Sequence, residues 1–155
     1  MKSELSNTNT SFNYLASSPE FLNLILNNIS SCVLLLNENM ELQAYNDALK
    51  TIFSNREGED LLYIRCGEAI GCAYAIEEVK QCGETTRCSS CELREAAMET
   101  YLTRKPVYKD HIFRPFFDRN QNKVDKHLEF STRFFQFEDE SYIILIINDI
   151  SNQFP

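Results

Sequence analysis

Hydrophobic positions near the start of the chain recur at helical spacing. Ser18-Pro19-Glu20 combines a residue typical of a helix N-cap, a proline at the first helical position and an acid in the first turn. The apolar residues that follow predict a short amphipathic helix of about twelve residues; they are Phe21, Leu22, Leu24, Ile25 and Ile29. Residues 1–17 are rich in Ser, Asn and Thr and have no apolar period, so we expect a flexible tail there.

After this helix, the spacing of apolar residues changes to that of β-strands. Cys32–Leu36 is a compact apolar run, residues 37–39 are turn-like, and residues 40–45 alternate between apolar and polar. This pattern predicts a β-hairpin. Asn46-Asp47 follows as a cap for one further short helix.

Strand periodicity returns near the C-terminus. We predict strands at 107–113, 128–134 and 141–150, with polar turns at 118–123 and 138–140. Consecutive antiparallel strands need no long crossovers. The order of elements therefore favours an α+β fold, in which a five-stranded antiparallel sheet has helices on one face.

The middle of the chain has an unusual composition. All four glycines and five of the six cysteines lie between Gly58 and Cys91. We expect a cysteine-rich segment of loops and short helical turns, with no long element before Ser89. Ser89 and Glu92 form a capping box that predicts a helix, and Pro106 ends it.

Composition and charge narrow the classes of function. The 155 residues fit a single domain. The formal net charge is −8, which disfavours binding to nucleic acid or to an anionic membrane surface. No apolar run is long enough to span a bilayer and the N-terminus has no signal-peptide pattern, so we expect a cytoplasmic protein. In that compartment cysteines serve as metal ligands or redox thiols more often than as structural disulfides.

Four cysteines form the most informative pattern, Cys72-x9-Cys82-x5-Cys88-x2-Cys91. The close pair Cys88 and Cys91 can turn two thiolates towards one ion. A helix that begins at Ser89 would hold Cys91 in its first turn, with Cys88 just before it, where free amides stabilise thiolates. We therefore predict that these four cysteines bind a metal centre.

Two further features bear on this prediction. Gly71 and Gly83 allow the backbone bends that bring Cys72 and Cys82 to the same point. Cys66 precedes Cys72 at the same spacing that separates Cys82 from Cys88, so Cys66 can replace one of the four ligands.

The chain resembles a PAS sensory domain over residues 18–151. Residues 27–53 resemble the PAS opening, in which a hairpin ends in a Tyr-Asn pair, here Tyr45-Asn46, that caps the next helix. Residues 126–137 and 141–151 resemble the closing hairpin, and the run NDIS at 148–151 is similar to the exit signal that leads to an output domain. The cysteine segment 66–97 resembles a cysteine-bearing subgroup of PAS domains in bacterial sensor kinases.

The resemblance implies a non-catalytic module of two-component signal transduction. It would sense redox state, oxygen or a metal and pass the signal through an exit at 152–155 to an output partner such as a histidine kinase. No output motif follows in this sequence. We therefore expect either a free-standing sensor or part of a longer one.

Several interpretations of the cysteines remain open. They bind an iron–sulfur cluster or zinc, act as a thiol–disulfide switch, or bind nothing. Structural zinc commonly uses two close cysteine pairs and this chain has one, while a cluster also gives a sensor its signal, so we favour iron–sulfur. An alternative is a small-ligand PAS domain with structural zinc. A thiol oxidoreductase is the weakest alternative, because Cys88-x2-Cys91 lacks a thioredoxin-like βαβ setting.

Other candidate residues have simpler interpretations. Cys32 lies in an apolar strand and is expected to be a buried hydrophobe. We expect His111 and His127 to be solvated or hydrogen-bonded rather than haem ligands, and the flavin-adduct signature is absent. A set of phenylalanines is expected to pack in the core rather than line a ligand cavity; it comprises Phe113, Phe116, Phe117, Phe130, Phe134, Phe135 and Phe137.

The N-terminal helix carries the last prediction. It is too short to be stable alone in water, so its apolar stripe must be buried. PAS domains commonly use such a helix in a parallel dimer. We predict a homodimer with Leu22 and Ile25 in the contact; packing of the helix on its own sheet is the alternative.

Overall fold

The computed structural model describes residues 12, 14–15, 17–56, 58–88 and 91–154. The predicted tail 1–17 and Ser89 therefore lie largely outside the described residues. The described elements are α2 (Pro19–Leu26), β1 (Cys32–Leu36), β2 (Leu42–Tyr45), α3 (Ala48–Ile52), α4 (Cys66–Ala69), α5 (Ala73–Glu78), α6 (Glu92–Thr103), β3 (Val107–Phe117), β4 (Lys123–Phe137), β5 (Glu140–Asp149) and the 3-10 helix η2 (Ser151–Gln153).

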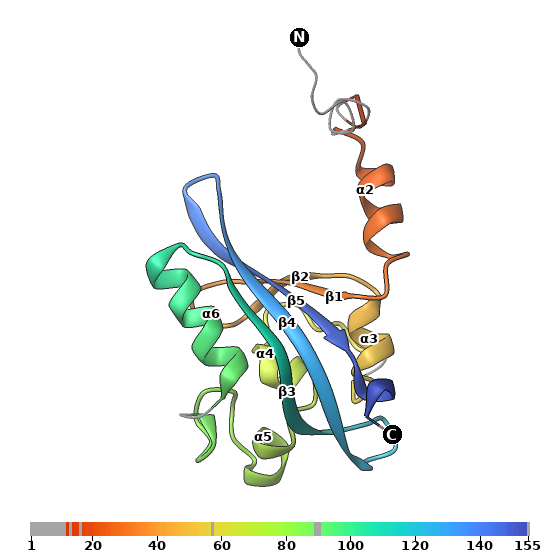
Figure 1. The fold of residues 1–155 in the computed structure, drawn as a ribbon, viewed down its shortest axis with the longest axis vertical. Coiled ribbons are helices and arrows are strands. Elements are labelled where there is room, and N and C mark those ends of the chain that lie inside the picture. The colour runs from red at the N-terminus through yellow and green to blue at the C-terminus, as the bar shows by residue number, and fades with distance from the viewer. Residues whose placement is uncertain (1–11, 13, 16, 57, 89–90, 155) are drawn as a thin grey trace.

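The expected five-stranded antiparallel sheet is confirmed, with the order β2-β1-β5-β4-β3. Helices α3 to α6 lie on one face of this sheet (Figure 1). Residues of β1 and β5 alternate between buried and partly exposed, because only one face of the sheet carries the core. Cys32 is fully buried in that core, and burial raises the pKa of its thiol to about 12.

Strands β3 and β4 are longer than the sequence pattern predicts. The predicted turn at 118–123 is shorter in the structure, since residues 113–117 pair in register with 123–127. Backbone hydrogen bonds form this part of the ladder. Its β4 side is mostly polar and Arg114 and Pro115 interrupt its β3 side, so hydrophobic alternation could not reveal it.

The phenylalanines do not gather in one place. Phe116 and Phe130 are fully buried in the core, whereas Phe113, Phe135 and Phe137 are exposed. They occupy both faces of the sheet, so the core interpretation holds for only part of the set.

Helix α2 begins as expected and ends early. Ser18 Oγ accepts a hydrogen bond from the Phe21 N–H at 3.2 Å, which caps the helix. The helix ends at Leu26, so Ile29 lies beyond it and the expected length of about twelve residues is wrong. No residue of α2 is buried, and the helix projects away from the sheet (Figure 1).

Asn46 does not cap α3, contrary to the sequence prediction. It is 3% exposed, and its Oδ1 accepts from the Val33 N–H at 2.9 Å. Its Nδ2 donates to the carbonyl oxygens of Leu26 and Ser31 at 2.7 and 2.9 Å. Asn46 therefore fixes the end of α2 to the edge of the hairpin, and the residue at the N-cap of α3 is Asp47, which makes no side-chain cap bond.

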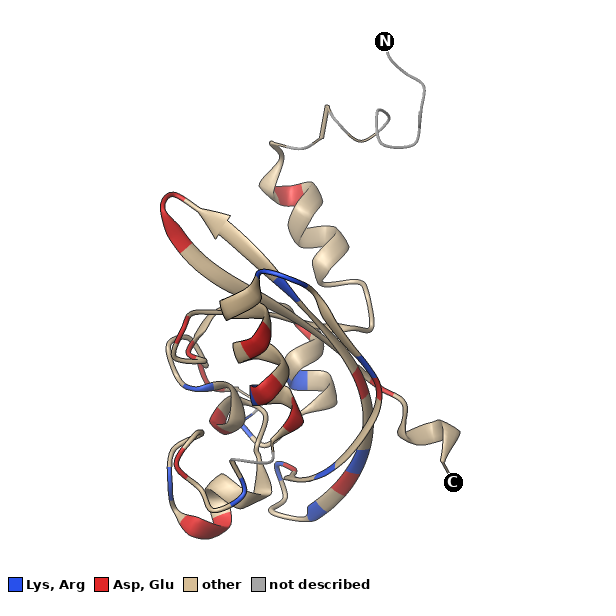
Figure 2. Cartoon of the chain, turned by 60° about the vertical axis from the view of Figure 1, so that its left-hand side comes forward, with Lys and Arg blue, Asp and Glu red and all other residues tan. Residues whose placement is uncertain are grey.

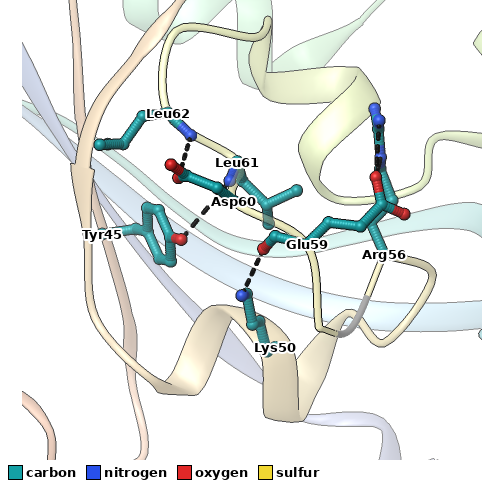
Figure 3. A network of polar contacts seen from close by, with 7 residues as sticks. All are labelled: Tyr45, Lys50, Arg56, Glu59, Asp60, Leu61 and Leu62. Atoms are coloured by element: carbon teal, nitrogen blue, oxygen red, sulfur yellow. Dashed lines mark hydrogen bonds and ion pairs between the residues drawn. The ribbon is translucent and has the colours of Figure 1, made fainter.

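The segment between α3 and α4 is held against β2 and α3 (Figure 3). Lys50 Nζ donates to the carbonyl oxygen of Glu59, and the Tyr45 hydroxyl accepts from the Leu61 N–H at 3.5 Å. These contacts fix the chain that leads into Cys66.

The C-terminal exit is held by polar contacts at the end of β5. Lys126 Nζ lies 3.1 Å from Asp149 Oδ2, and Asp149 Oδ1 accepts from the Ser151 N–H at 2.9 Å. Ser31 Oγ, just after α2, lies 2.5 Å from Asn148 Oδ1. The start of the domain and its exit are thus in direct contact.

The Asn46 contacts give a stability prediction. We expect Asn46→Ala to lower the free energy of unfolding by about 2–3 kcal/mol, because buried hydrogen-bonding groups lose their partner. Urea unfolding measures the change. Asn28→Ala is the matched control, because the Asn28 amide donates to the Leu24 carbonyl at an exposed position. Equal effects of the two substitutions would contradict the role assigned to Asn46.

A cysteine-lined cavity as the candidate functional site

The four predicted ligands converge on one small cavity, and Cys66 joins them. The cavity has a volume of about 20 Å³. Its wall is made of sulfur, apolar and cationic side chains, among them Cys66, Cys72, Cys82, Cys88, Cys91, Met40, Leu93, Arg94, Arg114 and Phe116. Residues far apart in the sequence therefore form a single site.

Cys72 is attached to the sheet directly. It forms an isolated antiparallel bridge with Phe116 of β3, and the Phe117 N–H donates to the Gly71 carbonyl at 2.9 Å. Gly71 has a φ of +76°, and a Cβ there would lie 2.8 Å from the Phe117 carbonyl oxygen. Glycine at this position lets the cysteine segment approach the strand.

Cys82 packs closely over the first turn of α4. The Gly67 N–H hydrogen-bonds to its sulfur, and a Cβ on Gly67 would lie 2.8 Å from Cys82 Sγ. Arg65 Nη1 donates to the Cys82 carbonyl oxygen at 2.7 Å. Burial raises the pKa of the Cys82 thiol to about 11, although the Gly67 hydrogen bond opposes that rise.

Cys88 lies in a loop whose donors point at its sulfur. The N–H groups of Gly83 and Thr85 donate to Cys88 Sγ at 3.2 and 3.3 Å, and the Thr85 hydroxyl lies 2.9 Å from it. Partial burial raises the pKa of Cys88, but these hydrogen bonds and the charge of Arg94 outweigh it and lower the pKa below its ordinary value.

Cys91 is the N-cap residue of α6, so its expected place inside the first turn is wrong. Its sulfur accepts from the Arg94 N–H at 3.5 Å, and the helix begins at Glu92. The sequence pointed to Ser89, a stronger capping residue, but a cysteine sulfur occupies the capping position. Burial raises the pKa of Cys91, while Arg114 opposes the rise.

Arg114 is the cavity residue that the sequence analysis missed. It is 7% exposed, and its Nη2 lies 3.9 Å from Cys72 Sγ. Burial lowers the pKa of the guanidinium, but Cys91 and Cys72 outweigh it and raise the pKa above its ordinary value. A signal was present in the sequence, because Arg114 interrupts an otherwise apolar inward-facing row with Ile112 and Phe116.

The environment of the cavity is locally positive. Arg114 also lies 3.8 Å from Glu92 Oε1 and over the ring of Tyr74, and Arg94 approaches Gly83. In the chain as a whole acidic residues predominate, and they are spread over α5, α6 and the turn between β4 and β5 (Figure 2). Two cationic side chains, Arg94 and Arg114, therefore line the cavity where the sulfur atoms meet.

The sulfur atoms share a cavity without closing around one point. Among the described residues, no three side chains of Cys, His, Asp or Glu have the spacing of a single-ion site. Cys66 is fully buried, and burial raises its pKa well above the ordinary value of a thiol. It therefore lies at the site as its neutral form.

The histidines lie away from the cavity. His111 Nε2 and His127 Nδ1 are 2.7 Å apart, and the Phe154 ring stacks on both imidazoles. This contact confirms the hydrogen-bonded alternative, and it places the pair beside the exit. Among the described residues, no helix has the length and apolar character needed to cross a bilayer.

The fold has close structural counterparts. No protein-family model matches the chain, and no curated protein matches its sequence. The PAS domain of nitrogen regulation protein NR(II) from Vibrio parahaemolyticus is similar at a TM-score of 0.60 and 12% identity, over 83% of this chain and 97% of that one. A PAS domain from a two-component sensor histidine kinase is similar at a TM-score of 0.54 and 12% identity, over 84% of this chain and 94% of that one. The PAS domain of an HTR-like protein from Haloarcula marismortui is similar at a TM-score of 0.54 and 15% identity, over 92% of this chain and 99% of that one.

The close contact at Gly67 gives a prediction for the site. We expect Gly67→Ala to lower the free energy of unfolding by about 1–3 kcal/mol, because the added methyl group forces Cys82 out of its position. Urea unfolding and the rate of Cys82 alkylation both report the change, and alkylation should become faster. Glu68→Ala on the same helix is the control. An unchanged stability with an unchanged alkylation rate would show that the contact is not restrictive.

Proposed function

We propose that this chain, which has the PAS fold, is a non-catalytic sensor module. In this proposal Cys72, Cys82, Cys88 and Cys91 bind a metal centre that responds to redox state, oxygen or metal supply. Cys66 is the candidate replacement ligand. We place the module in the cytoplasm, without a nucleic-acid or membrane partner.

The buried charge of Arg114 is the observation that carries the proposal. A buried guanidinium is unfavourable without negative charge close to it. Glu92 approaches Arg114 but is itself partly exposed, while Cys72 and Cys91 face it across the cavity. Four thiolates on a metal centre retain net negative charge, so they would supply the counter-charge that this position requires.

The volume of the cavity disfavours an organic ligand of ordinary size. A cavity of about 20 Å³ holds roughly one water-sized particle. Pockets for small molecules measure about 300–1,000 Å³. The alternative of a PAS domain that binds an organic ligand beside structural zinc is therefore less well supported.

Among metal centres we favour an iron–sulfur cluster. Four thiolates around one zinc ion, each at about 2.3 Å, would have to close on a single point. In a cluster the thiolates bind different iron atoms and need not converge on one point. A cluster supplies electron transfer when it is bound. A cluster can enter the cavity only if the segment 80–88 moves outward. This segment lies outside regular elements except at its last residue.

The exit of β5 is the proposed connection to an output. Asp149 is fixed by Lys126 and Ser151, and partial burial of its carboxyl is outweighed by these hydrogen bonds, which lower its pKa. One structural counterpart comes from a two-component sensor histidine kinase. We therefore propose a histidine kinase, or a protein of similar role, as the output partner.

Helix α2 is the proposed dimer contact. Leu22 is 56% exposed and Ile25 46% exposed, and Asn46 ties the last residue of the helix to the edge of the hairpin. An isolated helix of eight residues is not stable in water. We propose that the exposed apolar residues of α2 pack against α2 of a second copy of the chain.

The metal proposal predicts a pattern of substitutions. In anaerobically purified protein we expect Cys72→Ser, Cys82→Ser, Cys88→Ser and Cys91→Ser each to lose bound metal, because each removes one ligand. Elemental analysis and the visible absorbance spectrum measure the loss. Arg114→Gln keeps all four thiols and should lower the metal affinity by about tenfold, as loss of a side chain that contacts a metal ligand commonly does.

Cys32→Ser is the matched control and should retain the metal, since Cys32 is buried in β1. Cys66→Ser is expected to have a small effect or none. Full metal retention in Cys88→Ser would refute the ligand assignment. A wild-type protein that is colourless and contains zinc would show that the site binds zinc and not an iron–sulfur cluster.

The dimer proposal predicts the mass of the protein in solution. We expect a homodimer at micromolar concentration by light scattering. The double substitution Leu22→Glu with Ile25→Glu should give a monomer, because it introduces charge into the apolar stripe. A monomeric wild type, or a dimer that survives this substitution, would contradict the proposal.

A further inference from the structure

We propose that the metal-free cavity is a peroxide-reactive dithiol, in which Cys88 attacks a hydroperoxide and Cys91 then forms a disulfide with it. The reaction concerns thiols without metal. It therefore holds or fails separately from the proposed metal centre.

Cys88 has the contacts of an attacking thiol. Among the cavity cysteines it is the one whose sulfur receives hydrogen bonds from a loop, through the N–H groups of Gly83 and Thr85 and the Thr85 hydroxyl, within the described residues. These donors orient the sulfur and stabilise negative charge on it. Cys88 is also partly exposed, so a small peroxide can reach it.

Cys91 is placed to complete the disulfide. The Cys91 N–H donates to the Cys88 carbonyl oxygen at 3.2 Å, so the backbones of the two residues are in direct contact. Residues i and i+3 joined by such a hydrogen bond have α-carbons less than about 7 Å apart, which is compatible with a disulfide. Both sulfur atoms line the same cavity.

The other cysteines are less suitable partners. Cys66 is fully buried at the cavity. Cys82 packs so closely on Gly67 that a Cβ on Gly67 would lie 2.8 Å from Cys82 Sγ, so its sulfur has little room to move. Cys72 is tied to β3 by its bridge with Phe116. The close pair therefore reacts first.

The chemistry balances with the hydroperoxide as the oxidant. The Cys88 thiolate attacks the terminal oxygen, the O–O bond breaks, and the alkoxide or hydroxide leaves and takes a proton. The sulfur of Cys91 then attacks the sulfenic acid on Cys88, which releases water and forms the S–S bond. The net reaction converts two thiols and one hydroperoxide into a disulfide, an alcohol or water, and one further water.

The disulfide would act on α6. The Cys91 sulfur caps this helix by accepting from the Arg94 N–H, and α6 packs against β3, β4 and β5. Oxidation therefore changes the cap of a helix that covers most of the sheet.

Peptide mapping tests the proposal on the full chain, reduced and treated with a chelator. Trypsin cleaves after Arg87 and Arg94, so residues 88–94 form one peptide that contains Cys88 and Cys91 alone. After one equivalent of hydrogen peroxide we expect this peptide to lose the mass of two hydrogens. Cys91→Ser should instead leave a sulfenic acid on Cys88 that dimedone traps, and Cys88→Ser should abolish the fast reaction.

A matched pair of substitutions tests the role of the loop. Thr85→Val removes the hydroxyl near Cys88 and should slow disulfide formation by about tenfold, the effect of losing about 1.4 kcal/mol of stabilisation. Thr86→Val is the control, because the Thr86 hydroxyl donates to Glu78. A first disulfide that joins peptide 81–87 to peptide 88–94, or equal rates for the two variants, would overturn the proposal. So would the absence of any disulfide in residues 88–94.

Discussion

The site depends on one short connection between the cysteine segment and the sheet. Cys72 bridges to Phe116, and the Gly71 carbonyl accepts from the next residue of β3. Arg114 lies two positions earlier on the same strand and faces the same cavity. The bridge therefore fixes the thiols relative to the buried cation, and without it the segment would be a surface loop with no defined electrostatic environment.

The balance of charges in the cavity runs against that of the whole chain. The protein is acidic overall, yet Arg65, Arg94 and Arg114 surround the sulfur atoms. Burial opposes thiolate formation at Cys66, Cys82 and Cys91, while hydrogen bonds favour it at Cys88.

Hydrophobic periodicity predicted the sheet because its inner face is apolar. It could not predict where β3 ends and β4 begins, because backbone pairing extends both strands beyond the residues that alternate. Cysteine spacing predicted a shared site for Cys72, Cys82, Cys88 and Cys91, and these four line the cavity together with Cys66, whereas their role as metal ligands stays a prediction. The cap at Cys91 was missed because serine is the stronger capping residue. Arg114 was missed because its role depends on Cys72 and Cys91, which face it across the cavity but lie far from it in the sequence.

The hydrogen bond between Ser31 and Asn148 connects the two ends of the domain at one point. Asn46 clamps the end of α2 beside it, and β1 pairs directly with β5 along its whole length. The pairing of β1 with β5 therefore connects the end of α2 to the last strand of the sheet without passing through the cavity cysteines.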